Sequence, residues 1–511
     1  MILYFKNGSN ISGKLVRKTD DYYVIRWKGG EVTFYSNEID YIEEGATTPD
    51  RLGQVHEEEI WPYENDIAIK LTNGTVIDAE IIDVKKEIVT TGRKVGEGRI
   101  EQDIEREKIE YLLFKPVSNN ETKKKERDFK KLFPEMRFYK DGNVTVITDS
   151  YVTWVNKYKA TLRSVYTEIY FEFFTLYKER KPEFQNFVVI FDGHIDFIEY
   201  AIADGVPGWA VLGYYNPDER VLYLFNSLGD KFSEFIFEVL IGEKARAVDE
   251  IVDRLKKATD NKYELLLEGQ AADIKDKFWR YYNMIKADLK EETFNTLRHE
   301  FTHELFNNWG LQSIIVSRAA GKRSELIEKK REYLETEDLS KKREMLRDLV
   351  TMSRERYLAI DLEAANSWLA EGTATFCETY PLGDRNRRWL FLFQKMKREG
   401  IFYPLEHLTV YKMGSFPGVC PEAMLYAYAQ SWALVYFLMD RYPDRFMEYQ
   451  DRLTRETPKE DEDIRWFLEA LGKDLRTLEG EFLEYMAQFD ELEDPFIKKF
   501  VKWNNIFNEF K

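Results

Sequence analysis

The chain has 511 residues, more than the ~250–300 that one hydrophobic core serves, so we expect several domains. Its 75 Lys and Arg residues against 92 Asp and Glu residues give a formal net charge of −17, which argues against nucleic acid or an anionic membrane as partner. No apolar stretch reaches the ~18–20 residues of a membrane span. The two cysteines, Cys377 and Cys420, are too few for a disulfide framework.

The first residues carry no secretory signal pattern. Met1–Lys6 leads directly into the turn-forming pair Asn7-Gly8, without a charged region followed by an apolar one. We therefore expect a cytoplasmic protein by default, and an exported one if a leader has been removed.

Short runs of β-branched and aromatic residues, separated by Asn-Gly and Gly-Gly turns, predict strands up to about residue 115. The turn Asn7-Gly8 recurs as Asn73-Gly74 after a similar run, which indicates a second copy of the first segment. We expect two small barrel-like β modules, weakly resembling SH3-like or Sm-like barrels. They would serve either as docking modules or as structural appendages.

The pattern then changes from β to mixed α/β. Residues 118–134 open with polar and charged side chains, and we expect a linker there. The runs Asn143–Thr148 and Asn186–Phe191 predict strands, and Tyr151–Tyr177 predicts a helix because its aromatic residues recur at helical spacing.

A hairpin and a long helical region follow. Trp209–Tyr215 and Arg220–Phe225 predict two strands joined by a turn at Pro217. Beyond Asp230 the chain is expected to be almost entirely helical. Within that region, residues 318–358 carry many charges of both signs, which favours a solvated helical hairpin.

One motif carries recognisable chemistry. His299, Glu300 and His303 form an H-E-x-x-H sequence. Histidines at positions i and i+4 lie on one face of a helix, where both imidazoles reach one ion at about 2.0–2.1 Å. The intervening glutamate then lies beside the open position, where it takes a proton from a water molecule. Only five histidines occur in the chain, so two in one motif argue against coincidence.

A catalytic zinc ion needs a third protein ligand. The other histidines, His56, His194 and His407, form no second cluster. The better candidate is Glu371, a single acid within the apolar, small-residue segment W-L-A-E-G-T-A, which we expect to be helical. Gly372 would let this helix pack closely on a neighbour.

H-E-x-x-H followed by W-L-x-E-G-x-A resembles the gluzincin metallopeptidases, most closely the peptidase-MA-like bacterial group and more distantly the M1 aminopeptidases. The resemblance extends over roughly residues 138–488. It implies that Glu371 is the third zinc ligand and Glu300 the general base. Glu378, two turns after Glu371, would hold a ligand histidine from behind, or would be an ordinary exposed acid.

The resemblance also implies a tyrosine that stabilises the transition state. In the segment Y-A-Y-A-Q-S-W, Tyr428 occupies the family's position and Tyr426 is the alternative, although both could be core aromatics. The hairpin corresponds to the family's edge strand, where residues 209–212 would pair with the backbone of a substrate.

Two departures from the family pattern are visible. The 67 residues between His303 and Glu371 are many more than in the best-known relatives, and the charged insertion fills this gap as a lid or a partner surface. The G-x-M-E-N pattern that grips a free amino terminus is absent, so aminopeptidase specificity does not follow.

We therefore expect a multidomain α+β protein with two β modules followed by a thermolysin-like α/β and helical peptidase domain. It would bind Zn²⁺ and hydrolyse peptide or protein substrates. The alternatives are a catalytically inactive scaffold of the same fold that binds peptides or proteins, and an adaptor acting through its β modules. The expected boundaries are β modules at 1–46 and 54–117, a linker at 118–134, an α/β lobe at 135–230, a helical zinc-binding lobe at 231–400 and a helical region at 401–511.

Overall fold

The computed structural model divides the chain into two compact units, Met1–Ile60 and Trp61–Lys511. It describes short stretches within residues 2–43, and then residues 61–95, 98–204, 211–217, 219–227, 289–311, 328–333, 338–363, 367–409, 421–456 and 462–493, with a few single residues between them.

The first unit consists of strands, as the sequence predicts. β1 lies between β2 and β6 in one antiparallel sheet, and β3, β4 and β5 form a meander in another. The bounds are β1 Ile2–Phe5, β2 Asn10–Ser12, β3 Lys14–Lys18, β4 Tyr22–Trp27, β5 Gly30–Tyr35 and β6 Ile39–Glu43.

The second unit opens with a set of strands that has the same connectivity. β7 lies between β8 and β12, and β9, β10 and β11 form a meander. The bounds are β7 Ile67–Leu71, β8 Val76–Ile77, β9 Glu80–Val84, β10 Ile88–Val95, β11 Gly98–Glu105 and β12 Ile109–Phe114, with a 3-10 turn at Arg106–Lys108. Matching order in both sets agrees with an internal repeat. The expected barrels are not closed in the described residues, because each set forms two separate three-stranded sheets.

The second β set packs directly on the rest of its unit. The Leu112 N–H donates to Oγ1 of Thr167 at 2.8 Å, and Phe114 stacks on Tyr166 with ring centroids 3.7 Å apart. The Tyr166 hydroxyl in turn accepts from the Trp309 indole at 2.6 Å. The second β set therefore shares one hydrophobic core with the helices that follow.

The prediction of a linker at residues 118–134 is wrong. Residues Asn120–Leu132 form helix α1, whose first turn is capped by the Asn119 side chain accepting from the Thr122 N–H. The many lysines of this segment lead to the linker prediction. Phe129 and Phe133, one turn apart, are nevertheless both buried against the sheet and form a short apolar stripe.

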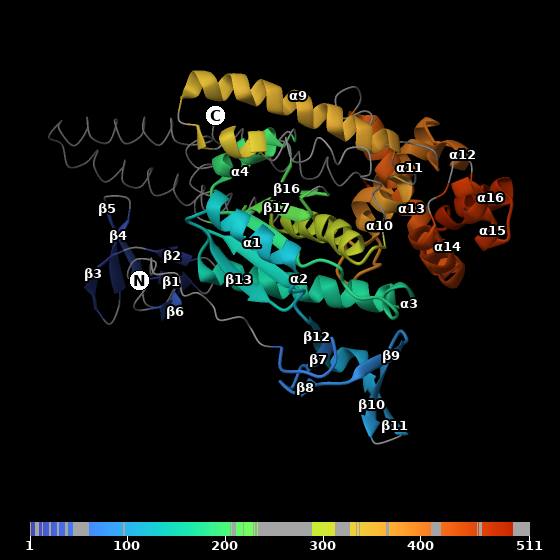
Figure 1. The fold of residues 1–511 in the computed structure, drawn as a ribbon, viewed down its shortest axis with the longest axis horizontal. Coiled ribbons are helices and arrows are strands. Elements are labelled where there is room, and N and C mark those ends of the chain that lie inside the picture. Colours follow the sequence, from blue (N-terminus) through green and yellow to red (C-terminus); the bar gives the residue numbers. More distant parts are fainter. Residues whose placement is uncertain are drawn as a thin grey trace, which may run out of the picture. The chain divides into compact units, whose positions relative to one another are not determined.

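A five-stranded sheet forms the centre of the larger unit, in the order β13-β14-β15-β17-β16 (Figure 1). β14, β15 and β17 are parallel, and the two edge strands are antiparallel to them. The predicted strands and hairpin are present. The bounds are β13 Arg137–Asp141, β14 Val144–Thr148, β15 Asn186–Phe191, β16 Gly213–Asn216 and β17 Val221–Phe225.

Strand alternation divides the sheet's side chains between two helical layers. Val188 and Ile190 face a core shared with α2 and with the helix over residues 289–308. Val189 and Phe191 face the opposite core, shared with α1 and α4. The helices around the sheet are α2 Val152–Glu172, α3 Phe174–Tyr177 and α4 His194–Ala203. The arrangement is a three-layer α/β/α sandwich.

The C-terminal region is helical, as expected, in its described part (Figure 1). α10 packs on α13 at very short range, since an added Cβ on Gly372 would lie 2.7 Å from the Ser431 carbonyl oxygen and from Cγ2 of Val435. The bounds are α10 Ser367–Phe376, α11 Arg387–Glu399, α12 Leu405–Leu408, α13 Pro421–Arg441, α14 Pro443–Arg455, α15 Glu462–Leu471 and α16 Leu475–Met486.

The charged insertion is not a fully solvated hairpin. Its described part comprises a short helix over residues 328–333 and the long helix α9, Leu339–Glu363. Tyr333 and Leu349 are buried against Ala203 of α4, with Met345 packed beside them. These apolar residues are few among many charged ones in the sequence, which is why the expectation of a solvated hairpin is wrong.

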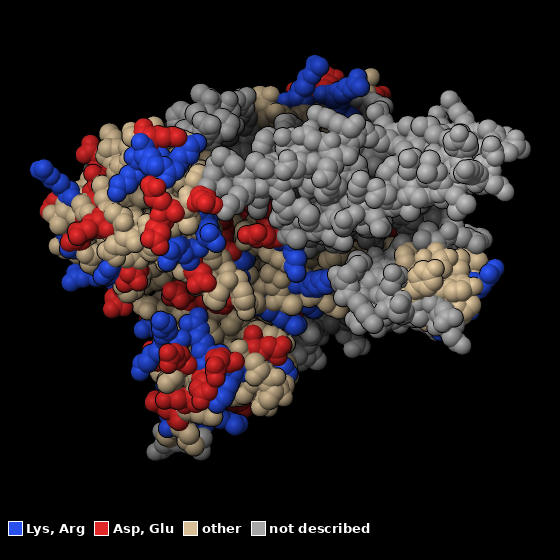
Figure 2. All heavy atoms as spheres, turned by 180° about the vertical axis from the view of Figure 1, so that it is seen from behind, with Lys and Arg blue, Asp and Glu red and all other residues tan. Residues whose placement is uncertain are grey.

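On the face shown in Figure 2, the described residues carry acidic and basic side chains intermixed. None of the helices in the described part has the length and hydropathy needed to cross a bilayer.

The close contact at Gly372 predicts a stability difference between two glycine substitutions. Gly372→Ala should lower the free energy of unfolding by about 1–3 kcal/mol, because the new methyl group overlaps backbone of α13. Gly480→Ala should raise it by up to about 1 kcal/mol, because nothing lies within 4 Å of that site in α16. Urea unfolding of both variants measures this. A Gly372→Ala protein with the free energy of unfolding of the wild type would contradict the close packing of α10 on α13.

Candidate metal centre

The H-E-x-x-H motif lies in the helix over residues 289–308. Leu297, Phe301 and Leu305 recur every four residues and are completely buried, which fixes that face of the helix in the core. The helix ends as predicted at Gly310, whose φ of 66° is a left-handed conformation that suits glycine. The motif is thus held rigidly at both its face and its end.

His299, His303 and Glu371 converge, as the sequence predicts. Their facing atoms are separated by 3.2 Å between the two Nε2 atoms, 3.2 Å from His299 Nε2 to Glu371 Oε2, and 3.4 Å from His303 Nε2 to the same oxygen. Ligands about 2.0–2.1 Å from a tetrahedral ion lie roughly 3.3–3.4 Å from one another. The three atoms therefore have the spacing of a tetrahedral zinc site.

The hydrogen bonding of this group also suits a cation. Oε2 of Glu371 is buried and accepts no hydrogen bond of good geometry from the described residues. Within those residues, no other three or more His, Cys, Asp or Glu side chains place their ligand atoms within 4.8 Å of one another. Two imidazole nitrogens and a carboxylate oxygen form the donor set that a catalytic zinc ion takes.

Behind His299 lies Glu378, which the sequence suggested as its support. Oε1 of Glu378 lies 3.0 Å from Nδ1 of His299, so Nδ1 donates and Nε2 keeps its lone pair for an ion. The other oxygen, Oε2, accepts from the Trp389 indole at 2.6 Å and from the Asn386 amide at 2.9 Å. Glu378 is therefore buried and fixed by α11, and it is not an exposed acid.

The acids around His299 change its proton affinity. Burial by itself would lower the pKa of His299, but Glu371, Glu378 and Glu300 outweigh it and raise that pKa well above its ordinary value. The pKa of Glu371 moves down although burial opposes this, because both histidines stabilise its anion. Without an ion, the group thus attracts positive charge in the form of a proton.

Glu300 lies next to the group and faces the edge strand. Its Oε2 accepts from the backbone N–H of Tyr215 at 2.8 Å. The Tyr215 hydroxyl accepts from the Asn307 amide at 2.8 Å, so the helix holds this strand residue at two points. Burial raises the pKa of Glu300, although His299 and His303 oppose the shift.

The two candidate tyrosines of α13 differ in their surroundings. Tyr428 lies with its ring centroid 6.4 Å from that of His299 and 6.2 Å from that of Trp389. Tyr426 lies beside Lys395, whose Nζ is 5.7 Å from its ring centroid. Of these two tyrosines, Tyr428 is the one adjacent to the candidate ligand His299.

The other two described histidines lie away from this cluster. His194 packs against Phe225, with ring centroids 4.4 Å apart, and His407 is exposed beside Glu406. His56 and Cys420 lie outside the described residues, and Cys377 is a buried free thiol.

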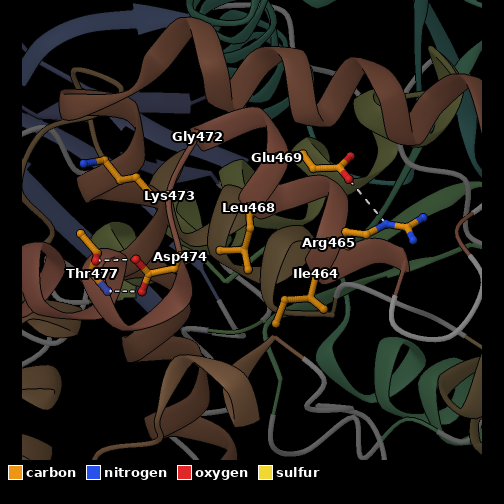
Figure 3. A pocket seen from close by; sticks show the side chains of 8 residues that line it. All are labelled: Ile464, Arg465, Leu468, Glu469, Gly472, Lys473, Asp474 and Thr477. Carbon is orange, nitrogen blue, oxygen red and sulfur yellow. Dashed lines mark hydrogen bonds and ion pairs between the residues drawn. The ribbon is translucent and has the colours of Figure 1, made fainter.

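A surface hollow of about 780 Å³ lies between α15, α16 and their connecting turn (Figure 3). Its polar side chains already pair within these elements: Arg465 with Glu469, and Asp474 with Thr477. The lining includes none of the metal-centre residues.

Sequence reasoning missed the residues that orient the centre, namely Trp389, Asn386, Tyr215 and Asn307. Only Asn386 had a local indication, because an asparagine before an amphipathic run is a typical helix N-cap, which it is for α11. The contacts of the other three depend on how distant elements pack.

Comparison of the chain with protein-family models, with curated proteins and with solved structures gives no match. The case for a function therefore depends on the site itself.

The contacts of Glu378 predict a loss of metal affinity in Trp389→Phe. Without the indole N–H, Glu378 holds His299 less firmly, and Zn²⁺ affinity should fall about tenfold. Competition with a chromogenic chelator measures this. Trp432→Phe is the matched control, because the Trp432 Nε1 atom has no hydrogen bond to the described residues. Equal zinc affinities in both variants would contradict the assigned support.

Proposed function

We propose that the chain is a zinc-dependent metallopeptidase of the gluzincin type, with a thermolysin-like catalytic domain. The observation that carries the proposal is the approach of Glu371 to both histidines at 3.2 and 3.4 Å from a point 68 positions beyond His303. A cation shared by the three side chains would offset the cost of burying the Glu371 carboxylate beside two imidazoles.

The chemistry requires a base, an ion and an oxyanion donor. When bound, Zn²⁺ would polarise the scissile carbonyl and lower the pKa of water toward ~7. Glu300 takes a proton from the attacking water and passes it to the leaving amine. Its placement one residue after His299, on the side that faces β16, supports this role. Tyr428 donates a hydrogen bond to the developing oxyanion.

The edge strand supports a peptide as substrate. Among the described strands, β16 is the last of the sheet, and its pairing with β17 uses one side of its backbone. The Tyr215 N–H points to the other side, toward Glu300. An extended peptide that added itself to this edge would run past the metal ligands. Residues 209 and 210 of the predicted strand lie outside the described part of the chain.

Glu300→Gln should retain zinc and lose peptide hydrolysis by at least about 100-fold, because the amide cannot accept the proton of water. Zinc is measured by elemental analysis, and cleavage by mass spectrometry of a mixed peptide library. Chelation should abolish wild-type cleavage and Zn²⁺ should restore it.

Glu304→Gln is the control for this substitution. Glu304 is on the same helix but is completely buried, accepts from the Phe187 N–H at 2.7 Å, and has a pKa raised well above its usual range by burial. Glutamine has the same shape, and its amide oxygen accepts the Phe187 N–H in the same way, so activity should persist. An inert wild-type protein that binds zinc and captures peptides would instead favour the binding scaffold.

Tyr428→Phe should lower kcat by about 10²–10³-fold and leave zinc content unchanged, which is the typical effect of losing one oxyanion donor. Tyr426→Phe should have little effect on kcat, because Tyr426 lies two residues earlier in α13 and beside Lys395. Steady-state kinetics on a cleaved library peptide compare the two. The reverse ranking would assign the role to Tyr426.

A further inference from the structure

A buried cluster of charges ties the insertion to the hairpin, on the sheet face opposite the metal-binding helix. Nζ of Lys330, from the insertion, lies 2.5 Å from Oδ1 of Asp204 and 3.3 Å from Oε1 of Glu219. Asp204 follows α4, and Glu219 lies in the turn between β16 and β17. One lysine therefore joins three separate parts of the fold.

The cluster is strongly desolvated, which makes its contacts costly to break. The side chains of Lys330 and Asp204 are each 3% exposed, and Glu219 is 14% exposed. The Tyr200 ring covers the ammonium group, with its centroid 3.6 Å from Nζ. Burial raises the pKa of Asp204, whereas Lys330 keeps that of Glu219 low despite burial. Removing the lysine would leave two acids facing each other without a cation.

The same cluster holds strand β16 directly. Oδ2 of Asp204 accepts from the Tyr214 hydroxyl at 2.7 Å and from the Asn216 amide at 3.1 Å. Tyr215, between them, faces the other side of the sheet and donates its N–H to Glu300. Because strand residues alternate, fixing Tyr214 and Asn216 on one face also fixes Tyr215 on the other.

We propose that Lys330 is a positioning residue for the metal centre: it anchors β16 from the far face of the sheet and so holds Tyr215 against Glu300. The catalytic part of this inference rests on the proposed peptidase function. The mechanical part does not, because it concerns the rigidity of the hairpin. The insertion then acts as a buttress of the edge strand that receives the substrate backbone.

The insertion has a second attachment that serves as a control. Lys342 of α9 pairs with Glu199 of α4 and lies beside the Tyr333 ring, with Nζ 5.0 Å from its centroid. This pair joins the same insertion to the same helix but does not contact the hairpin in the described residues. Lys342→Met should therefore leave the edge strand unchanged.

The experiment compares Lys330→Met with Lys342→Met in the full-length, zinc-loaded protein. In Lys330→Met, hydrogen exchange of the amides in 213–216 and 221–225 should become at least about tenfold faster. The kcat per bound zinc should fall about tenfold with a smaller change in KM, because Glu300 acts in the chemical step. Zinc content should remain that of the wild type. Lys342→Met should match the wild type in every measurement.

A second variant keeps the test decisive if Lys330→Met does not fold. Lys330→Met combined with Asp204→Asn removes one of the two acids left without their cation, so the carboxylates of Asp204 and Glu219 no longer repel each other, and it still lacks the tie between insertion and hairpin. Its hairpin should also exchange faster, and its kcat per zinc should fall.

Wild-type exchange in the hairpin of a folded variant would overturn the anchoring role. Faster exchange with unchanged kcat per zinc would overturn the catalytic consequence. If the wild type cleaves no peptide, the proposed function fails, and the exchange rates still decide whether Lys330 anchors the strand.

Discussion

The packing around the motif helix depends on one electrostatic constraint: two imidazoles and a carboxylate, all largely removed from water, meet within 3.4 Å, where a shared proton or cation stabilises them. His299 and His303 come from one helix and Glu371 from another, so the constraint joins two separate elements. A buried acid beside two bases is costly unless a positive charge is shared among them. The surrounding contacts therefore serve to keep this arrangement in register.

Three sets of packing contacts hold these side chains in place. The apolar face of the motif helix is fixed in the core by Leu297, Phe301 and Leu305. Gly372, next to Glu371, allows α10 to approach α13 closely. One oxygen of Glu378 accepts a hydrogen bond from His299, and the other accepts from Asn386 and Trp389 at the start of α11. The three side chains are thus held by groups outside the cluster of His299, His303 and Glu371.

The sequence predicts those parts that depend on local geometry. The i and i+4 spacing of His299 and His303 is a property of the helix, and a single acid in an apolar segment indicates a partner for Glu371. Short runs rich in β-branched and aromatic residues likewise predict β14, β15 and the hairpin, whose structure agrees. The match in strand order between the two β sets was also visible as a repeated turn.

What the sequence does not predict depends on packing between distant segments. Residues 118–134 resemble a linker because lysines outnumber the two phenylalanines that face the sheet. The insertion resembles a solvated hairpin for the same reason, although Tyr333 and Leu349 are buried. Barrel closure depends on pairing between strand ends, which alternation within a strand does not encode. The contacts of Trp389 and Tyr215 require the complete fold.

The two β sets share their strand order, and the second belongs to the core of the larger unit. The second contributes Phe114 to the stack on Tyr166, which accepts the indole hydrogen of Trp309 just before the glycine that ends the motif helix. A truncated protein that begins near residue 118 would lose this support and leave aromatic rings open to water. A fragment that is to contain the larger unit alone should therefore start at Trp61, where that compact unit begins.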